Sequence, residues 1–143
     1  MTEKFITTPQ GEEARVRFRH FRKDKTRIPV GTMTTIQPQG SENVFVGFSF
    51  CSNKDFFTKR RGREVSLVRA QTTMERGKEG VLYGAISREN VVELINILRT
   101  EKKLTSANGY KKFIEKYLKQ AKNYKKEIEN EVQEIENRKF IAN

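Results

Sequence analysis

The chain has 143 residues, a formal net charge of +11 at pH 7 and a pI of about 9.9. A balance this basic favours an anionic partner such as nucleic acid, a membrane surface or an acidic protein. Hydrophobic residues make up 35% of the chain, and ten Phe and four Tyr supply enough aromatic surface for one globular core. The composition therefore argues against full disorder and predicts a single ordinary domain.

The sequence also limits the compartment and the covalent chemistry. Cys51 is the only cysteine, which excludes an intramolecular disulfide and a cysteine-based zinc site within one chain. The polar start MTEKFITTPQ lacks the apolar core of a secretory signal, and no apolar run approaches the ~20 residues that span a bilayer. We therefore expect a cytoplasmic protein with no membrane partner.

Hydrophobic periodicity predicts an α+β fold, with a small antiparallel sheet and packed helices. Alternating apolar and polar residues indicate strands, and Gly, Pro and Asn clusters between them indicate turns. The polar residues 1–13 are expected to form a loose lead-in. The predicted strands cover residues 14–21, 28–37, 43–50 and 81–86.

Three helices are predicted from the 3.6-residue period and from capping residues. The first would run from Ser52 to about Arg76, and the second would follow Ser87 as its N-cap. The third covers residues 110–140, where no Pro or Gly interrupts the pattern, and would be about 45 Å long. We therefore divide the chain into an α+β domain over 1–105 and a long C-terminal helix over 106–143.

Arginines alternate with other residues along ARVRFRHF, residues 14–21. Alternate strand residues lie about 6.7 Å apart, which is about twice the rise of about 3.4 Å between successive bases of one DNA strand. Guanidinium groups on one strand face could therefore follow a phosphate backbone. The other interpretation is a solvent-facing sheet surface on which arginine only confers solubility. The residues concerned are Arg15, Arg17 and Arg19.

A second basic cluster lies in FFTKRRGREV, residues 56–65. If this segment is a loop or a first helical turn, Gly62 would let a phosphate approach the backbone. If it is helical throughout, only Arg60 and Arg63 lie on one side of the helix, and the other basic residues are solvated. Because strand 43–50 leads directly into this cluster, we expect it to lie near the first one. Its basic residues are Lys59, Arg60, Arg61 and Arg63.

Candidate residues for catalysis or metal binding are few. His20, the only histidine, lies on the strand face that is expected to point inward, and Cys51 follows a core strand. No Ser/His/Asp or Cys/His arrangement stands out, and no glycine-rich phosphate-binding motif is present. We therefore predict that the protein is not an enzyme and needs no metal or other cofactor.

The stretch FSFCSNKDFFTKRRGRE, residues 48–64, resembles a segment of small uncharacterised basic proteins encoded by phages and mobile elements. The resemblance carries no activity over to this chain. It does imply either a nucleic-acid accessory protein or an inhibitor of a host nucleoprotein complex, such as an anti-CRISPR protein. The residues that match the pattern are Cys51, Lys54, Asp55, Gly62 and Arg63.

The predicted C-terminal helix carries a heptad seam of apolar residues. Residues 110–126 hold seven Lys and one Glu, whereas residues 127–143 hold five Glu against Arg138 and Lys139. An antiparallel partner would place acid opposite base, so we predict a coiled-coil homodimer. The alternative is a helix folded back onto its own domain. The seam consists of Tyr110, Ile114, Tyr117, Ala121, Tyr124, Ile128 and Ile135.

These observations predict a non-enzymatic protein that binds DNA or RNA. The arginine strand and the start of the first helix would contact phosphates, with little sequence specificity. The alternative function is a phage-encoded, anti-CRISPR-like inhibitor that binds a host nucleoprotein complex through the same basic face.

Overall fold

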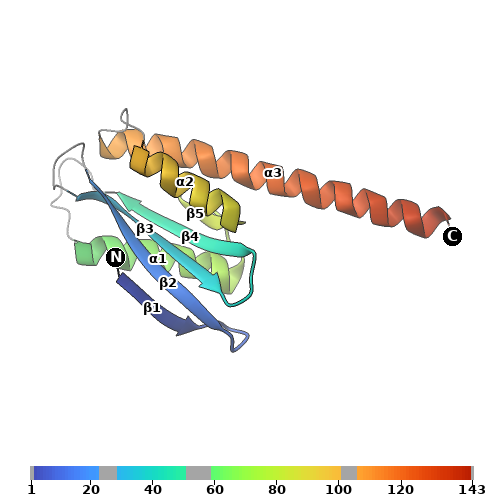
Figure 1. The fold of residues 1–143 in the computed structure, drawn as a ribbon, viewed down its shortest axis with the longest axis horizontal. Coiled ribbons are helices and arrows are strands. Elements are labelled where there is room, and N and C mark those ends of the chain that lie inside the picture. Colours follow the sequence, from blue (N-terminus) through green and yellow to red (C-terminus); the bar gives the residue numbers. More distant parts are fainter. Residues whose placement is uncertain (1, 23–28, 51–58, 101–105, 143) are drawn as a thin grey trace.

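The computed structural model describes residues 2–22, 29–50, 59–100 and 106–142. These residues form a five-stranded antiparallel sheet in the order β1-β2-β3-β4-β5, with helices on both of its faces (Figure 1). The predicted α+β class is confirmed. The elements are β1 (Thr2–Thr7), β2 (Glu13–Arg22), β3 (Pro29–Pro38), β4 (Asn43–Phe50), α1 (Lys59–Arg76), β5 (Tyr83–Ser87), α2 (Arg88–Thr100) and α3 (Ala107–Ala142).

The expectation of a loose lead-in over residues 1–13 is wrong, because Thr2–Thr7 forms the edge strand β1. β1 pairs antiparallel with β2, and Phe5 lies opposite Arg15 in the register. The sequence TEKFIT has two adjacent apolar residues and no alternation, so its own pattern does not predict a strand. This strand forms by pairing with β2. The turn that connects the two strands contains Gly11, which has a φ of 84°.

Each face of the sheet carries its own hydrophobic core. On one face, α1 packs against β3 and β4, and its side chains share a core with the even-numbered residues of β2. On the other face, α2 and α3 lie over β4 and β5 (Figure 1). The first core contains Ala14, Val16, Phe18, Ile36 and Ala70, and the second includes Met33, Val46, Phe48, Ile86, Leu94, Ile114 and Leu118.

The helix α1 lies very close to β4, because Gly47 has no side chain to separate them. A Cβ atom at Gly47 would overlap the Ser66 carbonyl oxygen and would lie 2.6 Å from the Ala70 amide nitrogen. The Ser49 hydroxyl donates a hydrogen bond of 2.9 Å to the Gly62 carbonyl. Gly62 is therefore buried between helix and sheet, and the interpretation in which it admits a phosphate is wrong.

Several predicted helix boundaries match the structure. α1 ends at Arg76, as expected, and Gly77 follows in the left-handed region with a φ of 64°. The Ser87 hydroxyl accepts a hydrogen bond of 3.2 Å from the Asn90 amide, which confirms Ser87 as the N-cap of α2. The predicted start of the first helix at Ser52 lies outside the described residues.

The first part of α3 belongs to the core of the domain. Tyr110, Ile114 and Leu118 are buried against the sheet and α2. The Lys122 ammonium donates hydrogen bonds of 2.8 Å to the carbonyls of Gly80 and Tyr83, just before and within β5. Beyond this contact α3 projects away from the sheet (Figure 1), and residues 130–138 are all exposed. Among the described helices, none has the length and apolar character needed to cross a membrane.

Candidate nucleic-acid interface

The arginines of β2 lie on the same sheet face as α2 and α3, because the residues that alternate with them pack against α1 on the other face. The two helices α2 and α3 lie over β4 and β5 and not over β2 (Figure 1). Arg15 is exposed, whereas Arg17 and Arg19 are half-buried. The predicted alternation is confirmed, because the residues between these arginines are buried against α1. Phe21 shares the arginine face but enters the core, where its ring stacks on Phe48, Phe50 and Tyr110.

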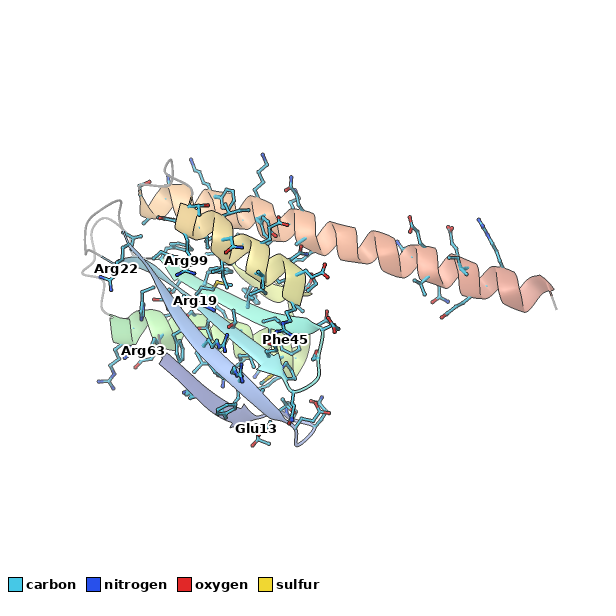
Figure 2. The ribbon with its side chains drawn as sticks, viewed as in Figure 1. Glu13, Arg19, Arg22, Phe45, Arg63 and Arg99 are labelled. Atoms are coloured by element: carbon cyan, nitrogen blue, oxygen red, sulfur yellow. The ribbon has the colours of Figure 1, made fainter. Side chains whose placement is uncertain are left out.

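The helix α2 adds two arginines to this face. Arg88 and Arg99 are separated by about three helical turns, so both lie on the same side of α2. Arg88 lines a pocket together with Arg15, and Arg99 is close enough to Arg19 to affect its titration. Figure 2 shows Arg19 beside the end of α2 that carries Arg99. We define the arginine surface as Arg15, Arg17, Arg19, Arg88 and Arg99.

Like charges are crowded on the arginine surface. Burial, together with the neighbouring charges of Arg17 and Arg99, lowers the pKa of Arg19. Arg88 is the first residue of α2, where the helix dipole disfavours a cation, so helix stability does not explain its position. A bound polyanion would relieve the repulsion that Arg17 and Arg99 exert on Arg19.

A pocket of about 300 Å³ opens at the end of the arginine surface where β2 begins. Phe5 contributes an aromatic wall, and its ring centroid lies 5.9 Å from the guanidinium carbon of Arg15. Glu13 is the acidic residue among those that line the pocket. The lining residues are Phe5, Glu13, Arg15, Gln37, Pro38, Gln39, Gly40 and Arg88.

The second predicted cluster lies on the opposite face of the sheet, in the first turns of α1. Arg60 and Arg61 are exposed, Arg63 is half-buried, and Arg60 forms an ion pair of 3.2 Å with Glu64. Lys59 is the first residue of α1. The expectation that the two clusters lie together is therefore wrong: α1 follows β4 but crosses behind the sheet, and in Figure 2 Arg63 is separated from Arg19 and Arg99.

Of the residues considered for catalysis, His20 forms a hydrogen bond within the sheet, and Cys51 lies outside the described residues. His20 is half-buried, and its Nδ1 atom shares a hydrogen bond of 2.9 Å with the Thr32 hydroxyl. Within residues 2–22, 29–50, 59–100 and 106–142, no group of three or more His, Cys, Asp or Glu side chains could hold a metal ion. Cys51, Lys54 and Asp55 lie outside these ranges.

The heptad seam of α3 is divided between two environments. Tyr110 and Ile114 are buried in the domain, and Tyr117 and Ala121 pack against the same core. These four residues are therefore core contacts within the chain, which corrects the prediction that they form a dimer interface. Ile135 is exposed, and the side chains of Tyr124 and Ile128 lie outside those described.

Sequence reasoning missed three residues of this surface: Phe5, Arg88 and Arg99. The separation of Arg88 and Arg99 by eleven positions places them on one helix face and could have been noticed. Phe5 gave no such signal, because its strand was not recognised. Comparison of the chain with protein-family models, with curated proteins and with solved structures gives no match.

Proposed function

We propose that the protein binds nucleic acid without catalysis, through the phosphates of the backbone, and that the arginine surface is its binding face. The observation that carries the proposal is the convergence of five arginines from β2 and α2 on one open sheet face. Arginine suits this role because its planar guanidinium donates paired hydrogen bonds to phosphate oxygens. Phosphate contacts carry no sequence information, so little sequence preference is expected.

The α1 cluster is the alternative binding face within the chain. Its residues lie on the opposite side of the sheet, so a short oligonucleotide that follows β2 cannot contact both faces. The ion pair of Arg60 with Glu64 also offers a structural reason for a basic residue there. The proposal therefore assigns binding to the arginine surface and leaves α1 outside the interface.

Salt dependence and matched variants test the proposal. With five phosphate contacts, the slope of log K against log salt is expected to be about −4.5 on duplex DNA and about −3.5 on a single strand. The test variant changes the exposed arginines of the surface to glutamine, and the control removes three charges from α1. The test variant is Arg15→Gln, Arg88→Gln, Arg99→Gln, and the control is Arg60→Gln, Arg61→Gln, Arg63→Gln.

Fluorescence anisotropy with a labelled oligonucleotide of mixed sequence measures both the affinity and its dependence on salt. The test variant should lose affinity and about three units of slope, since each phosphate contact contributes about one. The control should keep the slope of the unmodified protein. A flat salt response of the unmodified protein would overturn the proposal and favour an inhibitor that docks on a host nucleoprotein complex. Loss of slope in the α1 variant alone would move the site to α1.

A further inference from the structure

We propose that the ligand is single-stranded and that one of its bases enters the pocket beside Arg15 and stacks on Phe5. This inference rests on the proposed function and adds the class of nucleic acid and the residue that selects it. The arginine surface would hold the backbone, and Phe5 would hold a base at the end where β2 begins.

Phe5 occupies an unusual position for an aromatic side chain. It lies on the edge strand β1, and 55% of its surface is exposed although many other phenylalanines of the described chain are buried or packed in the cores. Its cross-strand partner Arg15 places a guanidinium against the ring. Aromatic rings and guanidinium planes are the two protein groups on which unstacked bases stack.

The pocket beside Phe5 has the size and lining for one planar base. Its volume of about 300 Å³ is at the lower end of the range for small-ligand pockets. The amide groups of Gln37 and Gln39 can each donate and accept hydrogen bonds, so they can pair with the edges of more than one base. Arg88, which also lines the pocket, can contact the adjoining phosphate.

A single strand fits this arrangement better than a duplex. In a duplex the faces of the bases are stacked on one another, so Phe5 could reach only the backbone. The arginine surface also lies on the sheet beside α2, with Arg17 and Arg19 half-buried, and does not protrude as groove-reading helices and ribbons do. A flexible single strand can follow β2 from the pocket past Arg17 and Arg19 to Arg99.

The first experiment compares two single strands that carry the same charge. One is an oligothymidylate of about 12 nucleotides, and the other is an abasic oligomer with the same number of phosphates. The unmodified protein should bind the oligothymidylate about tenfold more tightly, because stacking of one base is worth about that factor. Phe5→Leu should lose this preference and should bind the abasic oligomer as the unmodified protein does.

A second experiment uses the absence of tryptophan from the chain. Phe5→Trp creates a single indole, whose fluorescence should be quenched by the oligothymidylate and should stay unchanged with the abasic oligomer. Val68→Trp is the matched control, because Val68 is 60% exposed and lies on α1 across the sheet. Its fluorescence should respond to neither oligomer.

The outcomes separate the two proposals. Equal affinity of the unmodified protein for both oligomers, with a steep salt slope, would overturn base stacking and leave phosphate binding in place. An unchanged preference in Phe5→Leu would likewise overturn the role of Phe5. Failure to bind either oligomer at low salt, while a duplex of mixed sequence is bound, would overturn the single-stranded assignment. Failure to bind the duplex as well would overturn the proposed function itself.

Discussion

Phe5 and Arg15 illustrate how two side chains that are far apart in sequence form one feature. Each is ordinary alone, since an exposed phenylalanine or arginine on a strand needs no special explanation. Pairing of β1 with β2 brings the guanidinium within 5.9 Å of the ring centroid, and both residues line the same pocket. The combination of an aromatic ring and a guanidinium beside the pocket therefore comes from the pairing of two strands.

Tyr117 is a second residue whose properties depend on its partners. Its hydroxyl lies 3.1 Å from both the Asn90 carbonyl and the Glu93 carboxylate, and these two acceptors share its single proton. Burial, followed by the hydrogen bond and the charge of Glu93, raises the pKa of Tyr117 above its ordinary value. This hydrogen bond joins α3 to α2, so ionisation of the phenol would weaken that contact.

The pH dependence of stability follows from the direction of this shift. The folded protein keeps the phenol proton at a pH where the unfolded chain releases it, above about pH 10. The contribution of Tyr117 is therefore complete below about pH 10 and declines as the pH rises further. We expect the difference in unfolding free energy between the unmodified protein and Tyr117→Phe to shrink from about pH 9 to about pH 11. Urea denaturation at both pH values measures it, and a constant difference would contradict the assignment.

At the scale of elements, α3 consists of two parts with different surroundings. The part near Tyr110 and Ile114 is held by the sheet and α2. In the distal part, Val132 is 48% exposed and Ile135 is 51% exposed, and the Arg138–Glu134 ion pair at 4.0 Å is open to solvent. An exposed pair of this kind contributes only tenths of a kcal/mol. Burial of Val132 and Ile135 against a partner would remove their apolar surface from water and stabilise this part of the helix.

We therefore propose that a second copy pairs with the distal part of α3, through Val132 and Ile135. The lysine-rich first part of α3 cannot contribute its apolar residues to this dimer contact, because they are packed in the core of the domain. Val132→Glu with Ile135→Glu should convert a dimer into a monomer in sedimentation velocity at tens of micromolar, and leave the far-ultraviolet spectrum of the domain unchanged. The control Asn130→Glu with Asn137→Glu adds the same charge on the opposite side of the helix and should stay dimeric. A monomeric unmodified protein would disprove the dimer.

At the scale of the whole molecule, the sheet separates the two basic clusters. The Arg15–Arg19 row lies on the sheet face that carries α2, whereas Arg60 and Arg61 belong to α1 on the other face. Figure 2 shows Arg19 near α2 and Arg63 on α1. With a net charge of +11, the folded chain repels itself, and the effect of Arg17 and Arg99 on Arg19 is one instance. Electrostatic repulsion therefore limits stability at low ionic strength.

Salt should stabilise the free protein. Raising the ionic strength from about 0.01 M to about 0.1 M shortens the Debye length from about 30 Å to about 10 Å and screens this repulsion. We expect the thermal unfolding midpoint to rise, and to rise less in Arg15→Gln, Arg88→Gln, Arg99→Gln than in the α1 control variant. Differential scanning calorimetry in sodium chloride measures the midpoints. Equal salt effects in the two variants would show that the arginine surface is not the place where repulsion is concentrated.

Local sequence patterns predict the α+β class, four of the five strands, the N-cap Ser87 and the alternation that separates Arg15, Arg17 and Arg19 from the α1 core. These features can be predicted because periodicity and capping depend on residues that are close together in the sequence.

That TEKFIT is a strand follows only from the tertiary structure, because an edge strand can form through pairing without a pattern of its own. The tertiary structure also decided which basic residues share a surface: the path of α1 behind the sheet separates Arg63 from Arg19, and the packing of α2 brings Arg99 to it. Such long-range placement depends on contacts between distant segments, which periodicity does not encode.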